Sequence, residues 1–204
     1  MQINPENDVI EVDGKNVLYD PDAENVYILL NKLPGYLSAT VDFHGEPTII
    51  DLLPHTDKRL HLVGRLDKDT EGLLIVTNDG DLTYRLTHPK HHVDKVYLAY
   101  VEGNPTEESL DKLRRGIMLE WGMTAPAIVE RENLPKKDPN NTCLRITIHE
   151  GKKRQIKRMF SAIGHKVLKL RRIQLGPITL GDLRPGEYRY LTLEEIEILK
   201  RLSD

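Results

Sequence analysis

The sequence is poor in cysteine and in aromatic residues, and it has no long apolar run. Its one cysteine, Cys143, has no partner within the chain, which suits a reducing compartment. No stretch approaches the ~18 consecutive apolar residues that a membrane span needs. The N-terminal segment "MQINPENDVIEVDGK" also lacks the basic and apolar regions of a secretion signal. These absences predict a cytoplasmic protein that does not contact a membrane.

Charge is distributed unevenly along the chain. A net charge of −3 excludes a uniformly basic surface, and an aromatic content of 5% argues against a surface built mainly from stacked bases. Between Lys152 and Arg172, however, there are nine Lys or Arg residues and no Asp or Glu. This asymmetry predicts one strongly basic face.

The pattern of apolar residues predicts strands interleaved with a few helices. Strands are expected at 26–30, 73–77, 95–101, 143–149 and 166–173, and helices at 106–116, 150–165 and 192–202. A short helix capped by Asn78 or Asp79 is expected after the second strand. With 204 residues, the chain is long enough to bury a substantial core. The fold class is therefore α+β, or mixed α/β, with a mixed sheet flanked by helices.

Three carboxylates, Asp67, Asp69 and Glu71, stand on alternate positions before an apolar stretch. The segment nearly fits a calcium-binding loop, but its twelfth position is Asn78 where that loop needs a glutamate, and a strand follows where it needs a helix. The histidines of "THPKHH" are clustered too, but Pro89 prevents a continuous helix that would align them. We therefore predict no metal site.

A solvated turn is the ordinary interpretation of such an acidic segment. Asp67 differs from its neighbours because it follows Arg65 closely and precedes a buried strand. A carboxylate held at a cleft beside a cation stays ionised and can act as a nucleophile. This interpretation makes Asp67 the reactive acid and leaves Asp69 and Glu71 as turn-forming residues.

Three segments resemble conserved motifs of one enzyme family. "GRLDKDTEGLLIVTNDGDL", "HHVDKVYLAYVEG" and "EGKKRQIKRMFSAIGHKVLKLRRIQLG" are similar, in this order, to motifs of the pseudouridine synthases that modify ribosomal RNA. "HHVDKVYL" and "GPITLGDLRPGEYRYLT" are most similar to the small-subunit group, although a large-subunit enzyme stays an alternative. The resemblance implies a largely antiparallel mixed sheet with a central cleft. It covers residue 23 to the end, so residues 23–204 are expected to form the catalytic domain.

The resemblance also implies a reaction and a set of residues. The bond between uracil nitrogen and ribose breaks, the base rotates, and a ring carbon rejoins the sugar, without cofactor or metal. Asp67 corresponds to the nucleophile, which attacks the anomeric carbon, attacks the uracil ring or assists formation of a glycal. Lys157 is expected to pair with Asp67, Tyr97 to pack on the target base and Leu170 to line the uracil pocket. Arg65 is expected to contact RNA near the position that the flipped base leaves.

The basic segment is expected to bind RNA phosphates. The residues assigned to this contact are Lys153, Arg154, Arg158, Arg171 and Arg172. The partner is then ribosomal RNA, free or in a partly assembled particle, bound by a monomer.

Residues 1–22 are interpreted as a linker or as the remnant of an N-terminal RNA-binding domain of the alpha-L type. Two alternatives are a non-catalytic RNA-binding module and a metal-dependent phosphotransfer enzyme that uses Asp67 and Asp69.

Overall fold

The structure is a computed structural model that describes residues 10–12, 15–17, 25–41, 45–133 and 140–202. Near the N-terminus, β1 (Ile10–Val12) and β2 (Lys15–Val17) form a two-stranded antiparallel ribbon. Most of the predicted 1–22 segment lies outside the described residues. Its interpretation as a linker or domain remnant therefore stays a prediction.

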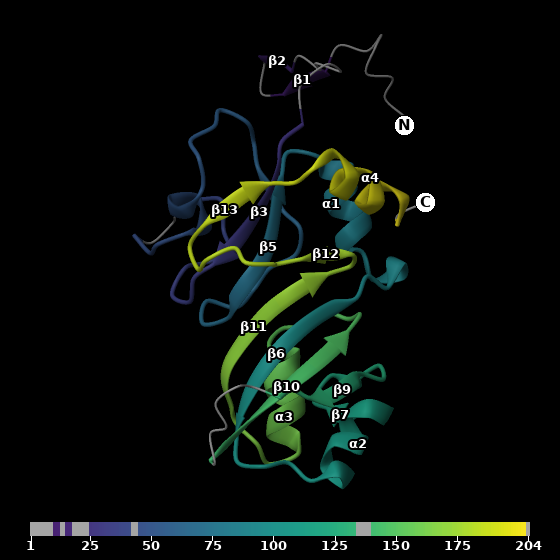
Figure 1. Cartoon of the computed structure of the whole chain (residues 1–204). Helices are drawn as coiled ribbons and strands as arrows, with labels where there is room; N and C mark the ends of the chain where they lie inside the picture. Colours follow the sequence, from purple (N-terminus) through teal and green to yellow (C-terminus); the bar gives the residue numbers. More distant parts are fainter. Residues whose placement is uncertain (1–9, 13–14, 18–24, 42–44, 134–139, 203–204) are drawn as a thin grey trace.

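The body of the protein is built on a nine-stranded mixed sheet with the main order β13-β3-β5-β11-β6-β10-β9 (Figure 1). β4 (His61–Leu62) pairs with β5, and β12 (Ile178–Thr179) pairs with β11. Among the described strands, only β5 and β11 pair in parallel. The predicted mixed, largely antiparallel sheet is confirmed. The strands of the main order are β13 (Tyr188–Tyr190), β3 (Tyr27–Lys32), β5 (Glu71–Thr77), β11 (Val167–Leu175), β6 (Lys95–Glu102), β10 (Asn141–Ile148) and β9 (Ile128–Arg131).

The parallel pair joins two parts of the sheet over a short distance. Its register contains only Arg171 opposite Glu71 and Arg172 opposite Gly72. Gly72 has a φ of +106°, and a Cβ atom there would lie 2.2 Å from the carbonyl oxygen of Arg172. Only glycine permits this close approach of the two strands.

Alternate side chains of β3 and β5 belong to two separate apolar cores. Leu30 and Leu74 enter one core together with Phe160, which we call the first core. Leu29 and Leu73 enter the other, the second core. Because successive strand residues point to opposite faces, the two cores lie on opposite faces of the sheet. β3 and β5 are thus buried on both sides, as their continuous apolar sequences require.

In the part of the chain that the structure describes, four α-helices and two 3-10 helices accompany the sheet. They are α1 (Gly80–Thr87), α2 (Glu107–Arg115), α3 (Gln155–Ala162), α4 (Leu193–Arg201), η1 (Ile49–Leu52) and η2 (Pro89–His91). α1 and α4 pack on the second core, and α2 and α3 pack on the first. Asp79 caps α1, as its sequence predicts, and Thr192 and Glu195 form the predicted capping box of α4. No helix in these ranges is long and apolar enough to cross a membrane.

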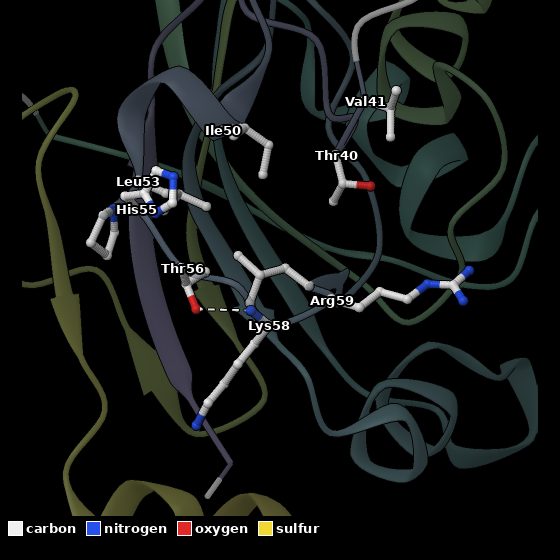
Figure 2. A pocket seen from close by; sticks show the side chains of 10 residues that line it. Thr40, Val41, Ile50, Leu53, His55, Thr56, Lys58 and Arg59 are labelled. Atoms are coloured by element: carbon white, nitrogen blue, oxygen red, sulfur yellow. Dashed lines mark hydrogen bonds between the residues drawn. The ribbon is translucent and has the colours of Figure 1, made fainter. Parts of the chain in front are cut away.

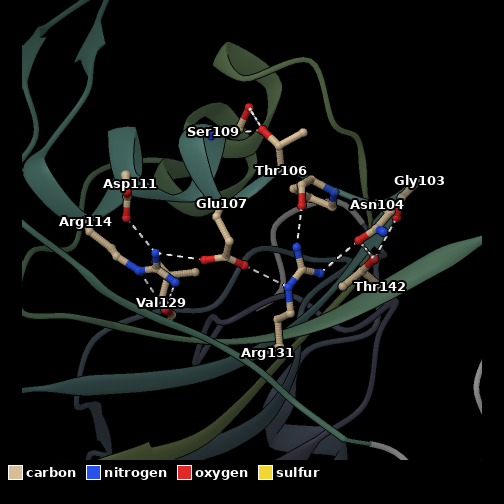
Figure 3. A network of polar contacts seen from close by, with 11 residues as sticks. Gly103, Asn104, Thr106, Glu107, Ser109, Asp111, Arg114, Val129, Arg131 and Thr142 are labelled. Carbon is tan, nitrogen blue, oxygen red and sulfur yellow. Dashed lines mark hydrogen bonds and ion pairs between the residues drawn. The ribbon is translucent and has the colours of Figure 1, made fainter.

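A polar network attaches α2 to the edge strand β9 (Figure 3). The carboxylate of Glu107 bridges Arg114, at 3.1 Å, and Arg131, at 2.9 Å. Arg114 also donates to the carbonyl oxygen of Val129 at 2.8 Å. The guanidinium therefore satisfies a backbone acceptor on an edge strand, and protected edges of this kind resist pairing with other chains. This network stabilises the fold and lies outside the catalytic motifs.

The predicted start of the helix at 150–165 is wrong. α3 begins at Gln155, and Lys153 lies in the preceding turn, with Arg154 as the N-cap residue at a φ of +55°. The side chain of Gln155 accepts from the backbone N–H of Lys152 at 3.1 Å, which holds the chain in a turn before the helix. Lys153 and Arg154 are exposed, but they do not lie on a helical face as expected.

Candidate active site

The loop that carries Asp67 is fixed at its base by backbone contacts. Ser38 Oγ donates to the carbonyl oxygen of Leu66 at 2.8 Å and accepts from its N–H at 3.1 Å. Gly35 N–H donates to the carbonyl oxygen of Lys68 at 2.7 Å, and Thr70 N–H donates to that of Asp67 at 3.0 Å. The turn that follows Asp67 is thus held on both sides, and the carboxylate starts from a defined position.

A buried lysine lies beneath this loop, and the sequence analysis missed it. Lys32 is fully buried at the end of β3. Its Nζ donates to the carbonyl oxygens of Thr70 at 2.9 Å, Lys68 at 3.2 Å and Asp67 at 3.3 Å. Burial lowers the pKa of Lys32 to about 8, although the charges of Asp69 and Asp67 oppose this shift. The signal that could have indicated it is a lysine two positions after the apolar run 26–30.

The structure brings Lys157 to the loop from α3. Its Nζ lies 3.3 Å from Asp67 Oδ2 and 2.5 Å from Asp69 Oδ1. The side chain of Lys157 is 13% exposed and that of Asp67 is 30% exposed, so the pair is partly shielded from water. The expected proximity of Lys157 to Asp67 is therefore present, across ninety positions of sequence.

Asp69 lies in the turn at 68–69, as expected, and it also contacts Lys157. The expectation is wrong for Glu71, which is the first residue of β5. Partial burial raises the pKa of the Asp69 carboxyl, but the hydrogen bond and charge of Lys157 outweigh it, and the pKa lies below its ordinary value. Glu71 is 9% exposed and pairs with Lys169 at 3.0 Å. Sequence spacing could not show this, because both partners come from distant elements.

Tyr97 and Leu170 lie in the first core beside the Asp67 loop. Tyr97 is 8% exposed and Leu170 is 6% exposed, and both belong to the same apolar cluster as Leu66. Arg65, which precedes Leu66 in the same loop, is exposed. The elements that carry Tyr97, Leu170 and Asp67 are thus neighbours, while the contacts of these side chains with RNA stay predictions.

The predicted RNA contact of Arg172 is wrong. This residue is 1% exposed, and its Nε donates to the carbonyl oxygen of Leu73 at 2.7 Å, where β5 and β11 meet. On the extended strand, Arg172 and Arg171 point to opposite faces, so adjacent basic residues have different surroundings. Arg171 is partly exposed and lies 3.9 Å from a carboxylate oxygen of Glu71.

Arg158 is also partly engaged within the protein. Its guanidinium lies over the ring of Trp121, 4.7 Å from the ring centroid, and it pairs with Glu120. A cation stacked on an indole ring is stabilised by the ring's negative face. A phosphate contact at Arg158 would therefore compete with Glu120, whereas Lys153 and Arg154 are exposed at the start of α3.

A cavity of about 470 Å³ lies in the segment that precedes the Asp67 loop (Figure 2). Apolar side chains and the basic residues Lys58 and Arg59 line it. Asp67, Tyr97 and Lys157 do not line this cavity. The reactive groups and this cavity are therefore separate features.

The Asp67 loop offers a carboxylate beside a cation, and this arrangement suits nucleophilic or electrostatic assistance at a carbon centre. Among the residues that the structure describes, no group of three His, Cys, Asp or Glu side chains is placed to hold a metal ion. The chemistry available from these side chains is that of a carboxylate that an ammonium group orients.

Comparison of the sequence with known proteins identifies a family that this chain matches. The family model described as RNA pseudouridylate synthase matches residues 26–162. The chain is 44% identical over 198 residues to ribosomal large subunit pseudouridine synthase B of Bacillus subtilis, covering 97% of this chain and 80% of the relative. It is 42% identical over 182 residues to ribosomal large subunit pseudouridine synthase E of Vibrio vulnificus, covering 84% of this chain and 77% of the relative.

A solved structure agrees with these matches. The crystal structure of a pseudouridylate synthase superposes with a TM-score of 0.76 at 38% identity, over 98% of this chain and 83% of the other. Fold and sequence together define an isomerase that acts on RNA. The chain belongs to the RNA pseudouridine synthase family.

The family and the fold class predicted from the sequence are confirmed. The sequence motifs led us to expect an enzyme of the small-subunit group. These relatives do not support that expectation, because both are named as large-subunit enzymes. The short motifs used for that distinction therefore did not separate the two groups.

Proposed function

We propose that this protein converts a uridine of large-subunit ribosomal RNA to pseudouridine, with Asp67 as the nucleophile. The relatives named for the large subunit support the choice of RNA, since two of them match most of this chain at 44% and 42% identity. The contact between Lys157 Nζ and Asp67 Oδ2 supports the choice of nucleophile. The substrate is the free RNA or a partly assembled particle, and the protein acts as a monomer.

The proposed reaction is balanced without any added group. The bond between N1 and the ribose carbon breaks, the base turns, and C5 forms the new bond to the same sugar carbon. The proton that leaves C5 is matched by the proton that N1 takes up, so the product is an isomer of the substrate. Asp67 supplies the negative oxygen, and Lys157 keeps it oriented.

The observation that carries the proposal is that the ammonium group of Lys157 contacts the carboxylate of Asp67, in the loop before β5 and ninety residues earlier in the sequence. Tyr97 and Leu170 are assigned to the walls around the target base, and Arg65 to the RNA beside it. Lys153, Arg154 and Arg171 are assigned to phosphate contacts, and Arg158 joins them if it exchanges Glu120 for a phosphate.

The experiment is a map of pseudouridine in both ribosomal RNAs from cells with and without the gene. We expect one or more large-subunit positions to disappear and to return with the wild-type gene, but not with Asp67→Asn. Purified wild-type protein should form pseudouridine at the same positions in transcribed large-subunit RNA. Loss of small-subunit positions instead, or full activity of Asp67→Asn, would refute the corresponding part of the proposal.

A further inference from the structure

Two exposed tyrosines lie on the edge strand β13. The side chains of Tyr188 and Tyr190 are 39% and 58% exposed, their ring centroids are 6.3 Å apart, and their planes are inclined at 86°. β13 is the terminal strand of the sheet order, so its outer edge borders no other strand among the described residues (Figure 1). Paired aromatic rings on an open edge are a typical binding surface.

The strand register places these rings on the face of the candidate active site. Tyr188 is paired with Leu30, and Leu30 is paired with Leu74. Side chains of directly paired residues point to the same face of a sheet. Leu30 and Leu74 pack in the first core with Leu66, the residue before Asp67. Tyr188 and Tyr190 therefore share a face with the catalytic loop.

The intervening residue holds the strand in this orientation. Arg189 points to the opposite face, where its two terminal nitrogens contact the carboxylate of Glu195 on α4, each at 2.7 Å. The same guanidinium donates to the carbonyl oxygen of Tyr190 at 3.2 Å. A bidentate ion pair at the back of the strand fixes which way the tyrosines face.

The start of β13 is joined directly to the strand that supports the Asp67 loop. Asn31 N–H donates to the carbonyl oxygen of Glu187 at 2.9 Å, and Gly186 N–H donates to that of Asn31 at 2.8 Å. The next residue, Lys32, binds the carbonyl oxygen of Asp67. From strand geometry, the Cα atoms of Tyr188 and Lys32 are about 8 Å apart. A ligand at the catalytic loop would therefore reach the aromatic pair without leaving this face.

We propose that Tyr188 and Tyr190 bind one unpaired nucleobase of the RNA that flanks the target uridine. This inference rests on the proposed function and adds a subsite to it. Because the rings are nearly perpendicular, a flat base can stack on one ring while its edge meets the other. Stacking on aromatic side chains tolerates any base and contributes about 1 to 3 kcal/mol per base. The pair thus supplies affinity beside the reacting nucleotide without reading sequence.

A second protein chain fits this edge less well than RNA does. A partner that adds a strand needs a row of unpaired backbone groups, but β13 has three residues and one of its carbonyl oxygens already accepts from Arg189. The position beside the loop that acts on RNA favours a base.

The test measures binding of full-length protein to single-stranded oligouridylate that carries one 2-aminopurine. The doubly substituted Tyr188→Leu, Tyr190→Leu protein should bind about 5- to 100-fold more weakly than wild type and should quench the fluorescent base less. The doubly substituted Tyr188→Phe, Tyr190→Phe protein should bind within about 2-fold of wild type, because it keeps both flat faces. The matched control is Tyr84→Leu, which removes a 54% exposed tyrosine from α1 on the other face and should not change binding.

With large-subunit RNA as substrate, the leucine variant should raise KM by a similar factor and leave kcat unchanged. The subsite is refuted if the leucine variant keeps the affinity and the quenching of the wild type. It is also refuted if Tyr84→Leu loses as much affinity as the leucine variant does. A wild-type dimer that the leucine variant converts to monomer would show a protein interface instead. Pseudouridine formation by the wild type decides the proposed function separately, since an active enzyme with unaffected tyrosine variants refutes only this inference.

Discussion

The Nζ of Lys157 lies nearer to Asp69 Oδ1, at 2.5 Å, than to Asp67 Oδ2, at 3.3 Å. One ammonium group therefore serves two carboxylates that stand two positions apart. Asp69 is 64% exposed and Asp67 is 30% exposed, so the more accessible carboxylate makes the shorter contact. The assigned nucleophile has the longer contact, and that contact is made through Oδ2.

Replacement of Asp69 tests whether it positions Lys157. Asp69→Asn removes one charge while retaining an acceptor, and we expect the single-turnover rate to fall about 2- to 5-fold, because an exposed ion pair contributes at most about 1 kcal/mol. Asp69→Glu should restore part of the rate. The measurement is the rate under saturating enzyme, with RNA affinity as the control. A loss as deep as that of Asp67→Asn would make Asp69 essential, and an unchanged rate would make it a surface charge.

Replacement of Lys157 should have a larger effect. Lys157→Met leaves Asp67 without its cation. Breaking a fully buried pair costs about 3 to 5 kcal/mol, but this pair is only partly shielded from water, so we expect a smaller cost and a rate loss of roughly one to two orders of magnitude. Lys157→Arg keeps the cation and should lose less. Thermal unfolding checks that each variant folds. Combining Lys157→Met with Asp67→Asn should lower the rate no further than Asp67→Asn alone, and an additive loss would mean that the two residues act independently.

The buried Lys32 should make stability depend on pH. Its folded pKa of about 8 lies below the ordinary value of 10.5, so the unfolded chain binds more protons between these values. The free energy of unfolding should therefore rise with pH in this window, by about 1.5 kcal/mol from pH 8 to pH 9.5 for this group. Lys95 has its pKa lowered to about 8 by burial and adds a similar rise.

Denaturant unfolding of Lys32→Met across this pH range is the check. The slope of stability against pH should flatten by about half relative to wild type, because only the Lys95 contribution remains. The variant should also be less stable throughout, since the carbonyl oxygens of Asp67, Lys68 and Thr70 lose the hydrogen bond from Lys32 Nζ, although Asp67 and Lys68 keep their backbone donors. An identical slope in the two proteins would show that Lys32 keeps an ordinary pKa.

A methyl group at Gly72 should separate the two parts of the sheet. In Gly72→Ala, the Cβ would lie 2.2 Å from the carbonyl oxygen of Arg172, and the backbone has a φ of +106°. We expect a stability loss of roughly 3 kcal/mol or more and a parallel loss of activity. The control is Gly122→Ala, where φ is +116° but nothing lies within 4 Å of the added atom. Equal losses in both variants would assign the effect to φ strain and not to the close approach.

The sequence by itself determined the local structure of this protein and its family. Alternation predicted the half-buried strand at 143–149, and β10 occupies Asn141–Ile148. The capping pattern of Thr192 and Glu195 predicted the start of α4. The family motifs marked Asp67, Lys157, Tyr97 and Leu170 as site residues, and their elements meet around the Asp67 loop. These signals are readable because periodicity, capping and motif spacing involve residues that are near in sequence.

Only the tertiary structure decided which charges face water, which pair and which are buried. Arg171 and Arg172 are adjacent and chemically alike, yet one lies near Glu71 and the other is sealed between β5 and β11. Asp69 gained its partner from α3, and Lys32 gained its acceptors from a loop more than thirty positions away. The surroundings of a charged side chain depend on the elements that packing brings to it, and those elements are distant in the sequence.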